Sequence, residues 1–197
     1  MSATLGQGFG PGCRSGDAAC GRHALAVLDN PVMDNTTFRL RAAAPSDLGA
    51  IVGLIGELAE FEKLSHLVVV TPESLAPHLF GDRPVAEAMV AELEGRVVGF
   101  ALFFTNFSTF LGQPGLYLED LYVQPAQRGL GIGKALLQRL GSLAVARGCG
   151  RFEWSVLDWN ENAIRFYQRM GATVMPDWRI CRVSGSALQA FAATPAG

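Results

Sequence analysis

The sequence predicts a mixed α/β fold, because segments of two kinds follow one another along the chain. Some segments alternate apolar and polar residues with a period of two, which is typical of half-buried strands. Others place apolar residues three and four positions apart after a helix-start signal. With 197 residues, of which 49% are hydrophobic and 17% charged, the chain is long enough to form a core.

We predict one globular domain over residues 35–197. Residues 1–34 are rich in glycine and alanine and show no sustained apolar period, so we expect a disordered N-terminal extension there. A start of translation at Met33 is a hypothesis that rests on the same composition. The first strand is expected at residues 37–41, followed by a helix from Pro45 to about Glu62.

The next helix has a clear start signal, since Thr71 can cap it and Pro72 fits its first position. A Glu94-Gly95-Arg96 turn then predicts a hairpin. The remaining predicted strands and helices alternate along the chain. The strands are 86–93, 97–104, 116–123, 152–156 and 178–183, and the helices are 133–147 and 160–170.

Charge and cysteine usage exclude several classes of protein. The net charge of −2 offers no basic surface for nucleic acid, and no apolar run has the length of a membrane span. The four cysteines form no C-x-x-C pair, so reduced thiols in a cytoplasmic protein are the simplest interpretation and we expect no metal site. No signal peptide is evident.

The most informative segment is Leu118 to Lys134. A strand carries the adjacent carboxylates Glu119 and Asp120, and the pattern Arg128-x-x-Gly131-x-Gly133 follows before an amphipathic helix. Glycines turn the backbone sharply and leave N–H groups uncovered, while a helix start adds partial positive charge. The segment therefore predicts a cradle for a pyrophosphate, with Arg128 as a charged clamp. A glycine-rich turn that only joins strand to helix is the alternative.

Two other nucleotide-binding motifs do not fit this segment. A Walker A loop requires glycine at the position of Arg128 and Ser or Thr at the position of Ala135. A dinucleotide fingerprint requires glycine where the chain has Lys134 or Leu136, depending on the register.

Further motifs accompany this loop in a fixed order. They are Glu57-Leu58-Ala59-Glu60-Phe61-Glu62, Leu116-Tyr117-Leu118-Glu119-Asp120, Trp159-Asn160-Glu161, Phe166-Tyr167-x-x-Met170-Gly171-Ala172 and Asp177-Trp178-Arg179. Together with the loop they resemble the GCN5-related N-acetyltransferase (GNAT) superfamily, in its diamine (spermidine/spermine) acetyltransferase branch, over about Phe38 to Phe191. The resemblance implies a mixed, mostly antiparallel sheet flanked by helices, with two splayed central strands.

The resemblance also implies acetyl-CoA as cosubstrate. By analogy, the residues that bind it are Leu121, Tyr122, Val123, Arg128, Gly129, Leu130, Gly131, Ile132, Gly133, Lys134, Asn160 and Tyr167. Asn160 also fits the cap position of its helix, and both roles are compatible.

Acetyl transfer to an amine requires that the acceptor lose a proton, since an alkylammonium with a pKa near ~10.4 has no lone pair. The resemblance implies Glu119 as the base, acting through a water, and Tyr167 as the acid that protonates the departing thiolate. Alternatively, Glu119 binds a cation or an ion-pair partner, and Tyr167 is a core residue. Because neighbouring strand residues point to opposite faces, we do not expect Glu119 and Asp120 to form a dyad. Cys149 and Cys181 lack a nearby histidine, so we expect direct transfer in a ternary complex.

The acceptor is expected to be the primary amine of a small molecule, bound by Glu62, Glu119, Asp120 and Trp178. A solvated helix face is the simpler interpretation of the acidic run from Glu57 to Glu62. The diamine enzymes carry an acidic residue and a tryptophan in the loop where this chain has Ser108 and Phe110, which leaves polyamines, thialysine and amino-acid-like amines open. Other readings are a protein or peptide N-acetyltransferase and a non-catalytic acyl-CoA sensor. The segment around Trp178 is expected to join a homodimer.

Overall fold

The computed structural model describes residues 38–193, so the predicted N-terminal extension lies outside the described residues. The chain divides into two compact units, one that ends at Ser155 and one that begins at Val156. The single domain that we expect over residues 35–197 therefore stays a prediction. Within residues 38–193, no helix has the length and hydropathy that crossing a membrane requires.

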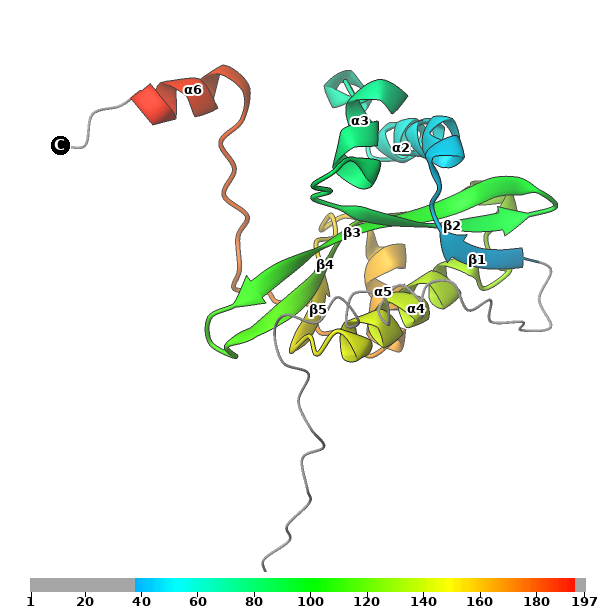
Figure 1. Ribbon diagram of the computed structural model, residues 1–197. Coiled ribbons are helices and arrows are strands. Elements are labelled where there is room, and N and C mark those ends of the chain that lie inside the picture. The colour runs from blue at the N-terminus through cyan, green and yellow to red at the C-terminus, as the bar shows by residue number, and fades with distance from the viewer. Residues whose placement is uncertain (1–37, 194–197) are drawn as a thin grey trace, which may run out of the picture. The chain divides into compact units, whose positions relative to one another are not determined.

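The first unit contains a five-stranded sheet in the order β1-β2-β3-β4-β5 (Figure 1). The strands are β1 (Phe38–Ala42), β2 (Glu87–Leu93), β3 (Arg96–Ser108), β4 (Gln113–Val123) and β5 (Arg151–Trp154). The first four pair antiparallel with their neighbours, and β5 pairs parallel with β4. The predicted mixed, mostly antiparallel sheet is confirmed.

Helices cover both faces of this sheet. The helices of the first unit are α2 (Leu48–Phe61), α3 (Pro72–Phe80) and α4 (Ile132–Ala146), with short 3-10 turns at η1 (Pro45–Asp47), η2 (Ser65–Leu67) and η3 (Pro125–Gln127). In Figure 1, α2 and α3 lie on one face of the sheet and α4 lies on the other. The core is thus formed in two layers, one on each side of the strands.

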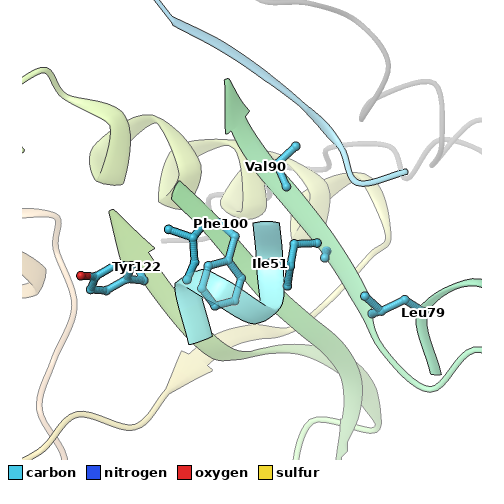
Figure 2. Packing of buried hydrophobic residues seen from close by; sticks show 7 residues of the cluster. Ile51, Leu79, Val90, Phe100 and Tyr122 are labelled. Carbon is cyan, nitrogen blue, oxygen red and sulfur yellow. The ribbon is translucent and has the colours of Figure 1, made fainter. Parts of the chain in front are cut away.

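The layer under α2 is an apolar cluster that crosses the middle of the sheet. Its buried members are Ile51, Leu54, Leu79, Ala88, Val90, Phe100 and Tyr122. Figure 2 shows Ile51 of α2 against Phe100 of β3, with Tyr122 of β4 at the edge of the cluster. On the opposite face α4 buries Leu136, Leu140 and Leu143 completely. Each apolar side chain of this size contributes about 1.5–3 kcal/mol when it is fully buried.

Two arginine–carboxylate pairs hold helices to the sheet. Arg41 of β1 forms a bidentate pair with Asp47, which is 6% exposed and also accepts a hydrogen bond from the backbone N–H of Ala44. The Arg41 guanidinium lowers the pKa of Asp47. At the end of α4, Arg147 pairs with both oxygens of Glu87 of β2 at 2.6 Å. These contacts fix the start of α2 and the end of α4 against the sheet.

A register shift interrupts the pairing of β3 with β4. Leu102 lies opposite Asp120 and Phe103 lies opposite Leu118, so Glu119 is an extra residue without a partner on β3. Such a β-bulge bends its strand and increases the local twist. The parallel pairing of β4 with β5 covers only Gly115 to Leu118 and ends at the same place. The described pairing of β4 with a neighbour on this side therefore stops at the bulge, and the expected splay of two central strands stays a prediction.

Several local predictions are confirmed by backbone geometry. Thr71 accepts a hydrogen bond from the N–H of Ser74 at 3.2 Å and caps α3. Glu94 and Gly95 both have positive φ, at 50° and 76°, and form the two-residue hairpin turn.

The second unit holds α5 (Glu161–Arg169) and α6 (Gly185–Ala193). Asn160 caps α5 by accepting a hydrogen bond from the N–H of Ala163 at 3.2 Å. The strand predicted over residues 178–183 is wrong, because this segment has no regular secondary structure and is exposed. A strand needs a neighbour for its backbone groups, and no described strand pairs with these residues. Helix α6, which follows, was not predicted.

We predict that Gly99→Ala destabilises the protein by about 1–3 kcal/mol, as overpacking of a close contact does. A Cβ at Gly99 of β3 would lie 2.9 Å from the carbonyl oxygen of Tyr122 and 3.2 Å from Val123 Cγ2 of β4. The measurement is the free energy of unfolding from urea denaturation.

The matched control is Gly53→Ala in α2, where a Cβ would meet nothing within 4 Å. That variant is expected to gain about 0.5–1 kcal/mol, because alanine loses less backbone entropy in a helix than glycine. Equal stability of the two variants would contradict the close approach of β3 and β4 at Gly99.

Candidate active site

The loop before α4 presents backbone N–H groups. Gly129 and Gly131 have φ values of 87° and 84°, in the region that favours glycine. Gly131 is the cap residue of α4 and supplies no side-chain hydrogen bond to the helix. Ala135 donates the first helical hydrogen bond to the Gly131 carbonyl, at 2.9 Å. The N–H groups of residues 132–134 therefore have no acceptor within the helix, and such a terminus suits a phosphate.

The end of β4 provides a second polar surface, made of backbone. Residues 119–123 lie along β3 on one side, and no described strand pairs with them on the other. The Val123 carbonyl oxygen accepts a hydrogen bond from Arg128 Nε. The other outward N–H and C=O groups of this stretch can bond an extended, amide-containing ligand as a neighbouring strand would. This stretch includes the predicted residues Leu121, Tyr122 and Val123, and the Tyr122 side chain itself is buried under α2. The donor set of loop and strand together fits a coenzyme that has a pyrophosphate and an amide-containing arm.

Three carboxylates meet at the bulge. Asp120 pairs with Leu102, whose side chain packs against the cluster under α2, so Asp120 faces α2 as well. Glu62 is the residue that ends α2. Burial, and then the negative charges of Glu119 and Glu62, raise the pKa of Asp120 to about 6. The predicted substrate residues Glu62 and Glu119 are thus each within electrostatic reach of Asp120.

The bulge breaks the simple alternation from which we expect Glu119 and Asp120 not to form a dyad. No hydrogen bond between the two side chains is found in the described residues, so that expectation stays a prediction. Glu119 is exposed, whereas Asp120 is half-buried. Burial raises the pKa of Glu62 too. Such a group of carboxylates binds a cation well, since a positive charge relieves their mutual repulsion.

The Arg128 side chain makes a hydrogen bond and two cation–π contacts within the protein. Its Nε donates to the carbonyl oxygen of Val123 at 3.0 Å, and its Cζ lies 5.5 Å from the ring centroids of both Phe61 and Tyr122. The Tyr122 hydroxyl in turn donates to Glu57 of α2 at 3.2 Å. The side chain that we expect to clamp a pyrophosphate therefore contacts α2 and the end of β4.

Sequence reasoning missed the contacts of Glu57 and Phe61. Gln124 Nε2 donates to Glu57 at 2.8 Å, so this member of the acidic run holds the end of β4. The available signal was the spacing of Glu57 and Phe61, four residues apart and therefore on one face of the helix. Their partners lie about sixty residues away in the chain, and no local pattern identifies them.

The remaining predicted residues lie in the second unit. The Asn160 side chain caps α5, and the Tyr167 ring lies 5.4 Å from that of Phe166 between centroids. Trp178 is 72% exposed. Their positions with respect to Glu119 stay predictions.

Covalent catalysis by cysteine finds no support in the described residues. Burial raises the pKa of Cys149, although Arg147 opposes the shift, so a thiolate is disfavoured there. Cys149 and Cys181 are both free thiols. Among residues 38–193, no group of His, Cys, Asp and Glu side chains is arranged to hold a metal ion.

Comparisons with known proteins agree with this geometry. The sequence model of the acetyltransferase (GNAT) family matches residues 57–172. Thialysine N-epsilon-acetyltransferase of Mus musculus is 40% identical over 78% of this chain and 96% of its own length. L-ornithine N5-acetyltransferase NATA1 of Arabidopsis thaliana is 37% identical over 78% of this chain and 87% of its own length.

Solved structures show the same fold. An integron cassette protein of V. cholerae superimposes with a TM-score of 0.68 at 24% identity, over 81% of this chain and 99% of its own. An aminoglycoside acetyltransferase from an uncultured soil sample gives a TM-score of 0.65 at 20% identity, over 77% of this chain and 98% of its own length.

The family match covers more than half of the chain, including the loop before α4, the bulge and the predicted Tyr167. The chain therefore belongs to the acetyltransferase (GNAT) family and is an N-acetyltransferase.

Proposed function

We propose that this enzyme transfers the acetyl group of acetyl-CoA to a primary amine of a small molecule, by direct attack in a ternary complex. The observation that carries the proposal is a single juxtaposition on β4. A free strand edge and an uncapped helix start offer donors for a coenzyme, and three carboxylates at the same bulge offer a site for an ammonium.

Backbone groups are proposed to hold the coenzyme. The N–H groups from Gly129 to Lys134 receive the pyrophosphate, and the free edge of Leu121 to Val123 pairs with the pantetheine arm. Asn160 and Tyr167 add contacts from the second unit, as the resemblance implies. Bound acetyl-CoA supplies the acetyl group and a thiolate leaving group.

Two side chains are proposed to move protons. Glu119 accepts a proton from the ammonium through a water, and the freed nitrogen lone pair forms the new bond to the acetyl carbon. Tyr167 donates its phenol proton to the sulfur as the carbon–sulfur bond breaks, because a phenol of pKa near ~10 can protonate a thiolate within hydrogen-bond reach. The acylated nitrogen then loses its second proton to solvent water, and the Tyr167 phenolate takes a proton back from solvent. Glu119 is exposed at the bulge, where water can reach it.

The acceptor is proposed to be an amino-acid-like amine. Glu62 and Asp120 attract its cationic end, with Trp178 as a further contact. Two relatives of high identity carry the names of thialysine and L-ornithine acetyltransferases. Ser108 and Phe110 have uncharged side chains, so neither offers a charge for the second ammonium of a polyamine.

A homodimer is part of the proposal. The segment after α5 exposes a run of large apolar side chains, namely Val174, Met175, Trp178, Ile180, Val183, Leu188 and Phe191. Exposed apolar patches of this kind are typical of interfaces. Sedimentation equilibrium measures the molar mass in solution and so distinguishes a dimer from a monomer. The cytoplasmic location expected from cysteine usage stays a prediction.

The first test is a thiol-release assay with acetyl-CoA and a panel of acceptors. We expect ornithine- and thialysine-like amines to be acetylated faster than spermidine, and faster than lysine-containing or N-terminal peptides. Faster turnover of peptides would favour the protein acetyltransferase. Binding of acetyl-CoA without any thiol release would favour the sensor.

We predict that Tyr167→Phe lowers kcat by about 10²–10⁴-fold, the usual contribution of a general acid. The dissociation constant of acetyl-CoA, measured by calorimetry, should stay nearly the same, since only the phenol oxygen is lost. Unchanged turnover would remove the acid role of Tyr167.

We predict that Glu119→Gln lowers activity most at low pH, where unprotonated amine is scarce and a base is most needed. The measurement is kcat/KM for the amine between pH 6 and pH 9. A variant whose profile has the shape of the wild type would exclude Glu119 as the base.

Asp120→Asn is the matched control, one residue away. The pKa of Asp120 is raised to about 6, so its carboxylate is charged above pH 6 and loses its charge below. The amine KM of the wild type should therefore rise below pH 6, whereas Asp120→Asn should have a high KM at every pH. The raised pKa also means that stability falls as pH rises through 6, so the variant should gain thermal stability at pH 8 and little at pH 4.

A further inference from the structure

The Arg128 side chain contacts three parts of the site at once. Its Nε bonds the Val123 carbonyl, at the end of β4, and its guanidinium lies against the rings of Tyr122 and Phe61. Tyr122 belongs to the sheet and is 5% exposed, so it forms a fixed platform. Phe61 is the last residue of α2. The cation therefore bridges the sheet, the end of a helix and the start of the loop before α4.

We propose that Arg128 is a positioning residue that fastens the end of α2, and with it Glu62, to the coenzyme-binding loop, so that amine and coenzyme bind cooperatively. This inference rests on the proposed function, because it assigns the amine to Glu62 and the coenzyme to the loop.

Side-chain packing becomes weaker toward the end of α2, although backbone hydrogen bonds from residues 62–64 close the helix. Ile51 and Leu54 are buried in the core, whereas Phe61 is 41% exposed. Immediately beyond, Lys63 has a φ of 62°, in the left-handed region that favours glycine. Glu62 lies between the two, so the position of its carboxylate follows that of Phe61. The guanidinium of Arg128, itself an exposed residue, lies over the Phe61 ring.

A second contact joins α2 to the end of β4, one helical turn before Phe61. Glu57 accepts hydrogen bonds from the Tyr122 hydroxyl and from Gln124 Nε2. Glu57 thus aligns α2 along β4, and Arg128 closes the last turn over the same strand. The carboxylate of Glu62 is thereby kept near Asp120, whose pKa it raises.

Arg128 also immediately precedes Gly129, whose positive φ opens the loop. A ligand that orders the loop lowers the freedom of Arg128, and therefore of Phe61 and Glu62. An amine that binds Glu62 then meets a site that the coenzyme has already ordered, so it binds more tightly. By thermodynamic linkage, the bound amine tightens coenzyme binding by the same coupling free energy. The loop and the acceptor carboxylate are coupled through one guanidinium stacked on two rings.

The test uses the full chain and three variants. Phe61→Leu keeps an apolar side chain and removes the ring. Arg128→Lys keeps the charge and removes the planar group that stacks on rings. Phe107→Leu is the control, because Phe107 of β3 is an exposed phenylalanine, at 60%, on the same unit. The double variant of Phe61→Leu and Arg128→Lys completes a mutant cycle.

Calorimetry measures the binding of L-ornithine with and without saturating CoA, which lacks the acetyl group and allows no turnover. In the wild type we expect CoA to tighten amine binding about 5-fold, at the lower end of usual coupling. Phe61→Leu should abolish this difference and raise the amine KM about 5-fold, with kcat and the dissociation constant of CoA alone little changed. Arg128→Lys should abolish the coupling as well, and the double variant should be no worse than the poorer single variant.

The proposal is overturned if Phe61→Leu keeps the coupling of the Phe107→Leu control, or if the two single changes are additive. It is also overturned if Arg128→Lys weakens only the binding of CoA, since Arg128 would then be a phosphate ligand alone. Failure of the proposed function looks different, because a wild type that binds CoA and amine but releases no thiol would still show the coupling.

Discussion

The single extra residue at Glu119 is the constraint on which the site depends. It shifts the register of β4 against β3, so Asp120 faces α2 and comes within reach of Glu62. It also coincides with the end of the pairing between β4 and β5. No described strand pairs with the far edge of residues 119–123, on the strand that leads into the loop before α4. One local irregularity thus lies beside both the proposed coenzyme edge and the proposed acceptor carboxylates.

The carboxylates at the bulge carry a cost in stability that a structural role would not explain. Asp120 is half-buried, and the charges of Glu119 and Glu62 add to its desolvation in raising its pKa. Elsewhere in the described residues the fold neutralises such groups, as Arg41 does for Asp47 and Arg147 does for Glu87. A site that keeps its like charges together is suited to a cationic ligand, and proteins tolerate this cost at functional sites.

Features that depend on neighbours in the sequence could be predicted, and features that depend on distant partners could not. The caps at Thr71 and Asn160 follow from helix-start patterns, because a side chain bonds the backbone three residues on. The bulge at Glu119 needs the register of another strand, and the stacking of Phe61 on Arg128 joins residues far apart in the chain. Alternating residues at 178–183 suggested a strand, but they find no described partner with which to pair.

The proposed site divides its two recognition tasks between backbone and side chains. We propose that the coenzyme is recognised by the N–H groups of the loop before α4 and by the edge of β4, which depend on glycine torsions and sheet register. The acceptor is proposed to be recognised by the carboxylates of Glu62, Glu119 and Asp120, where a single substitution changes the charge. A change in the first set of groups disturbs the fold, whereas a carboxylate on the surface of the bulge can be replaced without altering the sheet register. Two relatives of this chain, 40% and 37% identical to it, are named for thialysine and for L-ornithine. We therefore propose that the side chains around the bulge select the acceptor.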